Sequence, residues 1–298
     1  MVSLGRLLTA MVTPFDSEGN VDYEQAKRLA LALLKSGSDG VVVAGTTGES
    51  ATLSVEEHVR LIAEAKSAVG DKGTVVAGTG SNCTREAIEL TREAEQIGVD
   101  ASLQVVPYYN KPTQEGLFQH FKAIANSTSL PCILYNVPSR TVTSLAPDTV
   151  VRLSRIDNVI GIKEASGNLE QIARIIDGAG KDFLVYSGND SDTFPILAIG
   201  GYGVVSVASH LVGIRIKEMI DKFLAGKTGE AAAIHRRLLP LVSALFVVSN
   251  PIPIKYALNY VGFPVGKPRL PLTEPDDKAV AQIEAALKNY KIDLPIPV

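Results

Sequence analysis

Short apolar runs rich in Val and Ile recur along the chain, separated by segments in which apolar residues follow helical spacing. Runs that are apolar on both faces are typical of strands in a parallel sheet covered on both sides. They repeat at intervals of roughly 20–34 residues, the length of one strand–helix unit. Eight strands are predicted, over residues 7–12, 40–44, 74–78, 101–106, 132–135, 159–163, 184–187 and 204–207.

Helix-start signals follow several of these runs. Ser54 and Glu57 have the spacing of a capping box, and Thr84 and Thr113 each precede an acidic residue in the first turn of a predicted helix. The uninterrupted alternation of strand and helix indicates an α/β protein with a parallel sheet. Eight such units fit a closed (β/α)8 TIM barrel better than an open, doubly wound sheet.

Helical periodicity continues after the eighth strand, and no Ser/Gly-rich linker interrupts it. We therefore expect a catalytic barrel over residues 1–225 and a C-terminal helical extension, residues 226–298, packed on the barrel. Pro251 and Pro253 favour the start of a helix in this extension. The helices predicted after the last strand cover residues 212–224, 229–248, 251–261 and 274–290.

Composition narrows the class of protein. A formal net charge of −3 offers no electrostatic basis for binding nucleic acid or an anionic membrane. No run approaches the roughly 18 apolar residues of a membrane span, and we expect no signal peptide. The cysteines and histidines lack metal-ligand or disulfide spacing, and Cys132 is expected to be a small buried hydrophobe. We therefore expect a cytoplasmic protein without a metal.

Lys163 ends the apolar run of residues 159–163. A cation at the end of a buried strand is costly to desolvate, which favours the neutral amine. Because a neutral amine is a nucleophile toward carbonyl carbon, Lys163 is the first candidate for chemistry. The alternative is a structural lysine that pairs with a carboxylate such as Glu164 or extends its ammonium group into solvent.

Polar residues gather at the ends of other predicted strands. In a barrel of this class the reactive groups lie at the C-terminal ends of the strands and in the loops that follow. Besides Lys163, these positions hold GTTGES (residues 45–50), PYYNKP (107–112), YNVPSR (135–140) and SGND (187–190).

Each group also has a structural explanation. Residues 45–48 could form a turn and cap a helix, Tyr135 could be a core tyrosine, and Arg140 could be a solvated charge. Residues 200–203, GGYG, could cradle a phosphate, but no clear helix start follows them, and we interpret them as a glycine turn. The occurrence of the other groups together on one predicted face favours a functional site.

These side chains suit the chemistry of an imine. A lysine that attacks a ketone loses water to form an imine, which then acts as an electron sink. The proton transfers could pass through the Tyr135 hydroxyl if Thr46 or Thr47 holds its proton. Residues 46–47 could also hold a carboxylate, and Arg140 could bind a second one. The set predicts the making or breaking of a carbon–carbon bond on a 2-oxo acid.

Four motifs resemble those of one enzyme family. GTTGES at 45–50, PYYNKPTQEG at 107–116, YNVPSRT at 135–141 and GIKEASGN at 161–168 resemble the pyruvate-dependent class I aldolases of the dihydrodipicolinate synthase and N-acetylneuraminate lyase family. The likeness covers essentially the whole chain, including NPIPIK at 250–255. The lysine and the YN-P motif are shared across the family, whereas the threonine pair, Tyr109 and Arg140 resemble its synthase branch.

The resemblance implies a lyase that uses a catalytic lysine side chain and needs no cofactor. Lys163 would form the Schiff base with pyruvate. Tyr135, Thr46 and Tyr109 would relay protons, with Tyr109 supplied across a subunit interface. The family works as a homotetramer, a dimer of dimers, and catalyses the first committed step of diaminopimelate and lysine biosynthesis.

The resemblance also assigns the substrate contacts. Thr47 would hold the carboxylate of pyruvate, and Arg140 would bind that of L-aspartate 4-semialdehyde. Gly188 and Val205 would present main-chain carbonyls near the site, Val205 standing where the family often has Ile.

A regulatory site follows from the same resemblance. In sensitive members, L-lysine binds at the dimer interface as an allosteric feedback inhibitor. Glu86 could pair with its ammonium group and Asn82 could bind its carboxylate. Val55 departs from the histidine of some sensitive members, and ordinary interface residues remain the alternative. The matching positions are Ser50, Ala51, His58, Asn82, Glu86 and Tyr108.

Two other functions remain open from the sequence. One is another aldolase of the same family, acting on N-acetylneuraminate, 2-oxo-3-deoxygluconate or 4-hydroxy-2-oxoglutarate. The other is a non-catalytic small-molecule sensor built on the same barrel. The retained synthase pattern at Thr47, Tyr109 and Arg140 argues against the first, and the retained proton relay argues against the second.

Overall fold

The computed structural model describes residues 4–296 of the chain. The chain forms two compact units, one of residues 4–6 with Val75–Val205 and the other of Leu7–Thr74 with residues 206–296.

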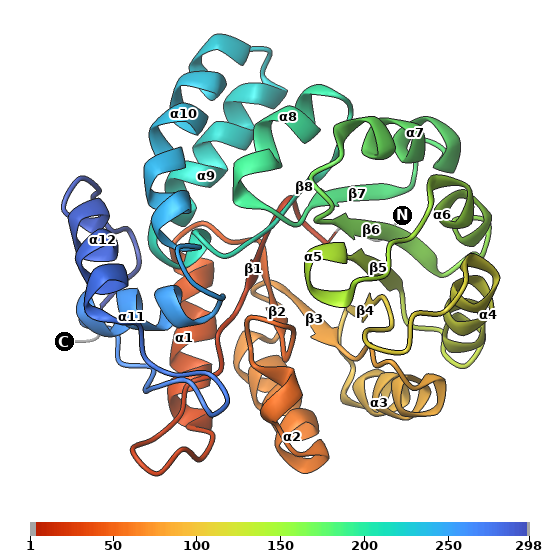
Figure 1. The fold of residues 1–298 in the computed structure, drawn as a ribbon, viewed down its shortest axis with the longest axis horizontal. Coiled ribbons are helices and arrows are strands. Elements are labelled where there is room, and N and C mark those ends of the chain that lie inside the picture. Colours follow the sequence, from red (N-terminus) through yellow and green to blue (C-terminus); the bar gives the residue numbers. More distant parts are fainter. Residues whose placement is uncertain (1–3, 297–298) are drawn as a thin grey trace. The chain divides into compact units, whose positions relative to one another are not determined.

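Eight parallel strands, hydrogen-bonded to one another in chain order, close into a barrel (Figure 1). This confirms the predicted TIM-barrel class, and each predicted strand is present to within two residues at either end. Almost every strand residue is buried, as expected for a parallel sheet covered by helices. The strands are β1 (Leu7–Ala10), β2 (Gly40–Val43), β3 (Thr74–Gly78), β4 (Ala101–Val105), β5 (Cys132–Asn136), β6 (Val159–Glu164), β7 (Leu184–Ser187) and β8 (Gly203–Ser206).

Helices follow the strands as the alternation predicts. In the barrel region they are α1 (Tyr23–Lys35), α2 (Val55–Val69), α3 (Thr84–Ile97), α4 (Gln114–Ala125), α5 (Pro138–Thr141), α6 (Pro147–Leu153), α7 (Leu169–Ala179), α8 (Thr193–Ala198) and α9 (Ser209–Leu224), with 3-10 turns η1 (Ser50–Thr52) and η2 (Asp190–Asp192).

All three predicted helix starts are present, but a side chain caps only two of these helices. Ser54 and Glu57 form both hydrogen bonds of the capping box, and the Thr113 hydroxyl caps α4. In α3, by contrast, the N-cap is Cys83 and no side chain caps the helix. Thr84 is the first residue of α3, with the predicted acidic residue Glu86 in the first turn, and its hydroxyl bonds to His120 Nδ1 at 2.9 Å. The long-range partner determined the role of this threonine.

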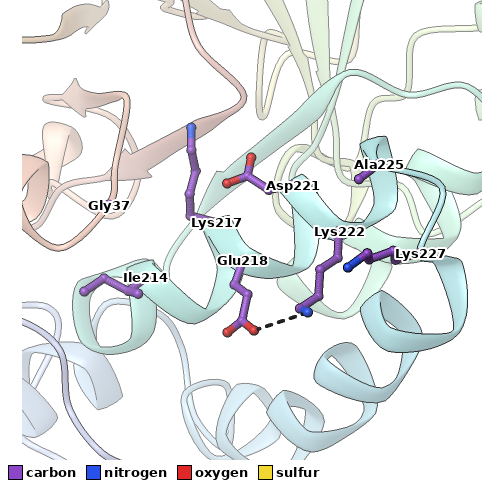
Figure 2. Close-up of a pocket in the computed structure, with 8 residues that line it drawn as sticks. All are labelled: Gly37, Ile214, Lys217, Glu218, Asp221, Lys222, Ala225 and Lys227. Carbon is purple, nitrogen blue, oxygen red and sulfur yellow. Dashed lines mark ion pairs between the residues drawn. The ribbon is translucent and has the colours of Figure 1, made fainter.

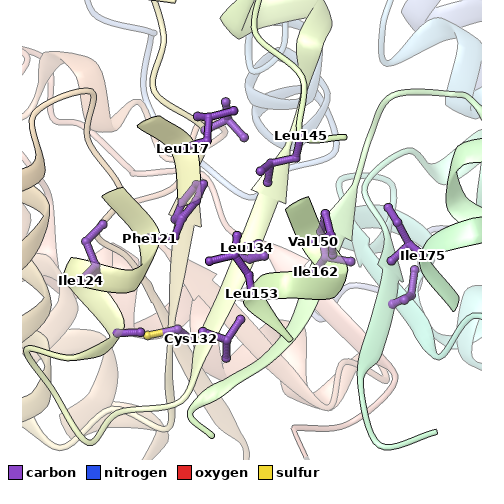
Figure 3. Close-up of a cluster of buried hydrophobic side chains, with 14 of the residues drawn as sticks. Leu117, Phe121, Ile124, Cys132, Leu134, Leu145, Val150, Leu153, Ile162 and Ile175 are labelled. Atoms are coloured by element: carbon purple, nitrogen blue, oxygen red, sulfur yellow. The ribbon is translucent and has the colours of Figure 1, made fainter. Parts of the chain in front are cut away.

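An apolar cluster fills the space between β5–β7 and helices α4, α6 and α7 (Figure 3). Leu134 and Ile162 point into this cluster from adjacent strands, so their sequence neighbours Tyr135 and Lys163 face the other side of the sheet. Cys132 lies in the same cluster at 2% exposure, which confirms the buried thiol, and burial raises the pKa of this thiol to about 11. Packing of this cluster therefore determines which face of the sheet the Lys163 side chain occupies.

The chain continues after α9 as α10 (Thr228–Ala244), α11 (Ile252–Tyr260) and α12 (Asp277–Leu287), drawn in blue in Figure 1. Helix α10 packs against α9 and α12, and α11 packs against α12. Pro251 is the N-cap of α11, as the prolines predicted. Helix α9 begins at Ser209, earlier than predicted, and is interrupted at Val212, the predicted first residue, where the backbone leaves helical geometry.

Candidate active site

Lys163 and Tyr135 are direct neighbours across strands β5 and β6. The parallel register pairs Tyr135 with Lys163, so the two side chains share one face of the sheet. Lys163 Nζ lies 4.2 Å from the centroid of the Tyr135 ring, and each residue is only 6% exposed. The ammonium group is therefore held beside an aromatic ring and largely removed from water, as expected for a nucleophilic lysine.

Glu164 does not pair with Lys163, which removes one structural explanation for this lysine. Its side chain lies on the opposite face of β6, where Asn136 Nδ2 donates to Oε1 at 2.5 Å and Ser166 Oγ donates to Oε2 at 2.7 Å. The residue is fully buried, and this burial raises the pKa of its carboxyl group to about 7. The low exposure of Lys163 is equally inconsistent with an ammonium group extended into solvent.

Asn136 joins this carboxylate to the segment that carries Arg140. The Asn136 Oδ1 atom accepts the N–H of Leu145 at 3.0 Å while its Nδ2 atom binds Glu164. Arg140 lies between these anchor points on the short helix α5, which begins at Pro138, and its side chain is exposed. Asn136 and Glu164 were not among the predicted site residues. Their signal was the two-residue period, which places both on the face behind Tyr135 and Lys163.

Gly188 and Val205 lie at the ends of the next two strands. Gly188 follows β7, and its N–H donates to the carbonyl oxygen of Glu164 at 2.7 Å. A Cβ atom at Gly188 would lie 2.7 Å from the Cβ of Ala165, so only glycine allows this close approach. Val205 belongs to β8 and is 1% exposed.

The loop after β2 holds the predicted carboxylate-binding threonines, and it lies in the other compact unit. Thr47 is 4% exposed, and its hydroxyl accepts a hydrogen bond from Asn250 Nδ2 at 2.8 Å. The carbonyl oxygen of Thr46 accepts the N–H of Glu49 at 3.1 Å, which closes a tight turn. The hydroxyl of Thr13 donates to the carbonyl oxygen of Gly48 at 2.5 Å. The turn expected at 45–48 is therefore present, and a hydrogen bond also holds the Thr47 hydroxyl.

Glu49 in this loop forms a buried ion pair that sequence analysis did not predict. Lys255 Nζ lies 2.8 Å from Glu49 Oε1, and both side chains are 1% exposed. Burial lowers the pKa of Lys255 to about 8, against the attraction of the Glu49 charge. A separation of 206 residues in the chain leaves no local signal for this pair.

Tyr108 and Tyr109 lie on the loop after β4. Tyr109 is 90% exposed with φ of 73°, in the left-handed region that a tyrosine rarely adopts. The carbonyl oxygen of Tyr108 accepts hydrogen bonds from the Asn110 N–H at 2.9 Å and from Asn82 Nδ2 at 3.1 Å. These bonds anchor the loop and leave the Tyr109 ring projecting from the chain.

The predicted regulatory residues fall into both compact units. Asn82, Glu86 and Tyr108 belong to the first, where Glu86 Oε2 accepts a hydrogen bond from Ser81 Oγ at 2.9 Å. In the second unit, η1 begins with Ser50 and Ala51, and the largely buried His58 belongs to α2. The amide expected to bind a ligand carboxylate thus bonds to Tyr108 in this structure.

A cavity of about 450 Å³ lies along α9, and none of the predicted site residues lines it (Figure 2). Its lysines have carboxylate partners: Lys217 binds Asp39 at 2.5 Å, and Lys222 binds Glu230 and lies 3.8 Å from Glu218. Lys227 also lies 3.9 Å from Glu230, so every lysine that lines the cavity has a carboxylate within ion-pair distance.

Within residues 4–296, no group of three or more His, Cys, Asp or Glu side chains is arranged to hold a metal ion. No helix in that part of the chain is long and apolar enough to cross a membrane.

Residues 200–203 form the expected turn, in which Gly203 opens β8 and Gly200 has φ of 105°.

Comparison with known proteins gives consistent matches. The model of the dihydrodipicolinate synthetase family matches residues 3–290. A 4-hydroxy-tetrahydrodipicolinate synthase from Dehalococcoides mccartyi is 66% identical over 296 residues, covering 99% of this chain and all of the relative. The enzyme of that name from Moorella thermoacetica is 55% identical, covering 96% and 98%.

Solved structures agree with these sequence matches. Dihydrodipicolinate synthase from Bacillus anthracis has a TM-score of 0.95 at 46% identity, covering 98% of this chain and 100% of that one. The enzyme from Cyanidioschyzon merolae, solved with lysine bound, has a TM-score of 0.95 at 50% identity, covering 96% and 98%.

Proposed function

This chain belongs to the dihydrodipicolinate synthetase family, and from that premise we propose how its residues produce 4-hydroxy-tetrahydrodipicolinate. The reaction condenses pyruvate with L-aspartate 4-semialdehyde, and it is the first committed step of diaminopimelate and lysine biosynthesis. The observation that carries the assignment to Lys163 is its burial beside the Tyr135 ring at the end of β6.

Lys163 provides the nucleophile of the first step. Its Nζ atom adds to the ketone carbon of pyruvate, and the resulting carbinolamine loses water to form an imine. Loss of a proton from the methyl carbon then gives an enamine. The enamine carbon attacks the aldehyde carbon of the second substrate, which forms the new carbon–carbon bond. Finally the amino group of that substrate displaces Lys163 from the imine carbon, closing the ring and freeing the enzyme.

Tyr135 serves these steps as the proton carrier nearest to Lys163. Dehydration of the carbinolamine and formation of the enamine both require proton transfer at the reacting atoms. We assign the rest of the relay to Thr46 and to Tyr109 of a neighbouring subunit. The left-handed, 90% exposed Tyr109 supports this assignment, because its ring projects from its own chain while hydrogen bonds to the Tyr108 carbonyl anchor the loop.

Two groups of residues bind the substrate carboxylates in this proposal. Thr47 and neighbouring N–H groups hold the carboxylate of pyruvate, and Arg140 binds the carboxylate of L-aspartate 4-semialdehyde. The main-chain carbonyls of Gly188 and Val205 accept hydrogen bonds near the imine. The exposed position of Arg140 on α5 supports a role at the mouth of the site.

The family relatives favour this activity over the two alternatives. The curated relatives at 55–66% identity all carry the name of the synthase, over nearly the full length of this chain. A sialic acid or sugar-acid aldolase and a non-catalytic sensor are therefore less well supported. Measuring turnover of pyruvate with L-aspartate 4-semialdehyde against cleavage of 2-oxo-3-deoxy sugar acids separates the three functions.

Borohydride trapping tests the assignment of Lys163. Reduction in the presence of pyruvate should leave one stable adduct on the peptide that contains Lys163, detected by mass spectrometry. Lys255 provides an internal control, since it is also buried but is held by Glu49. An unmodified Lys163, or an adduct elsewhere, would overturn the mechanism.

We also propose how this protein is regulated, how it assembles and where it is located. We assign feedback binding of L-lysine to Ser50, Ala51, His58, Asn82, Glu86 and Tyr108. The relative solved with lysine bound supports this, at 50% identity. We expect a homotetramer in the cytoplasm, measured by analytical ultracentrifugation and cell fractionation. An initial rate unchanged by millimolar lysine would remove the regulatory site.

A further inference from the structure

Asn250 connects the C-terminal helical extension to the carboxylate-binding loop. It lies immediately before α11, and its Nδ2 atom donates to the Thr47 hydroxyl at 2.8 Å. Both residues are largely buried, Thr47 at 4% and Asn250 at 7% exposure. With one lone pair occupied by this bond, the Thr47 hydroxyl hydrogen is directed elsewhere. The amide therefore determines which way the hydroxyl can donate.

Residues of the same extension also bind the carboxylate of Glu49. Lys255 on α11 binds Oε1 at 2.8 Å, and the backbone N–H of Arg269 donates to Oε2 at 2.9 Å. Lys255 also donates to the carbonyl oxygen of Lys267 at 3.0 Å, so its ammonium group joins the loop to the segment after α11. The aromatic ring of Phe15 covers this ammonium group at 4.0 Å from its centroid.

Arg269 extends the attachment to the far side of the loop. Its guanidinium binds both oxygens of Glu57, at 2.6 and 2.8 Å, and donates to the carbonyl oxygen of Thr52 at 2.9 Å. Glu57 also closes the capping box of α2. The segment from Thr47 to Glu57 is thus tied at both ends to residues 250–269.

The loop itself cannot supply this rigidity. It contains Gly45 and Gly48, and Glu49 holds the left-handed conformation at φ of 56°, which is unfavourable for a residue with a Cβ atom. External contacts must maintain such a geometry. Binding groups need positions accurate to about half an ångström, so the support of a loop affects affinity as much as the groups themselves.

We propose that Asn250 and Lys255 are positioning residues for pyruvate binding: they hold Thr47 and Glu49 so that residues 46–47 can bind the substrate carboxylate. This inference rests on the proposed function. The C-terminal helical extension then contributes to the substrate affinity of the barrel, in addition to any contribution to stability.

Two variants sever the connection in different ways. Asn250→Ala removes the donor to Thr47. The double variant Glu49→Gln with Lys255→Met removes the ion pair without leaving a lone buried charge, so it retains a route to folding. Tyr256→Phe is the matched control: Tyr256 adjoins Lys255 on α11, but its hydroxyl bonds to Glu284 within the extension at 2.7 Å.

The readout is the pyruvate concentration that gives half-maximal borohydride trapping at Lys163, measured without turnover, together with both KM values and the Tm. We expect the pyruvate concentration to rise about 3- to 10-fold in Asn250→Ala, as for one lost hydrogen bond, and at least as much in the double variant. The KM for the aldehyde and the trapping of Tyr256→Phe should stay within twofold of the parent.

The outcomes separate this inference from the proposed function. If both loop variants lower the Tm but trap pyruvate at the parent's concentration, the extension is merely structural and the inference is wrong. An equal rise in both KM values would also overturn it, because the effect would not be specific to pyruvate. If the parent itself forms no adduct on Lys163, the proposed function fails first.

Discussion

Replacing Glu164 with Gln should change how the stability of this protein depends on pH. The carboxyl group is fully buried behind Lys163, where Asn136 and Ser166 donate to its two oxygens. Gln can keep both contacts: its carbonyl accepts from Asn136, and its amide donates to Ser166, whose hydroxyl can reorient. The substitution therefore removes a titrating group and little else.

The magnitude follows from the raised pKa. Burial raises the pKa of Glu164 from 4.5 to about 7, so the folded state binds this proton more tightly than the unfolded state does. The carboxyl group contributes its full stability below pH 4.5 and loses it as the pH rises through 7. At 1.36 kcal/mol per pH unit, the loss is about 1 kcal/mol at pH 5 and about 3 kcal/mol at pH 8. Glu164→Gln should therefore gain about 2 kcal/mol relative to the parent between these two pH values.

Urea unfolding at pH 5, 6, 7 and 8, with fixed ionic strength and protein concentration, measures this difference. Subtracting the parent at each pH cancels the other titrating groups and any constant cost of the substitution. Glu170→Gln on α7 is the matched control for loss of an exposed carboxylate, paired here with Arg174. A difference between Glu164→Gln and the parent that stays flat from pH 5 to 8 would refute the reasoning.

Three further predictions concern other parts of the molecule. Arg140→Ala should raise the KM for the aldehyde substrate by about 10- to 100-fold, as for a lost charge-assisted hydrogen bond, with the pyruvate KM unchanged; equal effects on both would contradict its role. Lys255→Met should lower the free energy of unfolding by about 3–5 kcal/mol, because the buried Glu49 side chain loses its ion-pair partner. Adding Glu49→Gln should restore most of that loss in urea unfolding. His210 accepts the Val12 N–H, and burial lowers the pKa of its imidazole to about 4. The imidazole should therefore stay neutral by NMR down to about that pH, and the free energy of unfolding should fall as the pH drops from 6.5 to 4. An imidazolium signal at pH 6 would contradict this.

The residue pattern by itself determined the strands, most helix starts and the position of Lys163. These features depend on neighbours within a few residues: the two-residue period of a strand, the bond of Ser54 to Glu57, and the apolar run that ends in a cation. Such local preferences are readable because the residues that determine them lie close together in the sequence.

Contacts between distant segments were decided only by the tertiary structure. The register that pairs Tyr135 with Lys163 depends on how two strands slide past each other, and the burial of Glu164 depends on the helices that cover them. Thr84 is a second example: its hydroxyl bonds to His120 on another helix, and its local sequence does not predict that partner. Glu49 and Lys255 form a buried ion pair across 206 residues. Neither residue carries a local sign of its partner, because the energy that pairs them arises only when folding removes both charges from water.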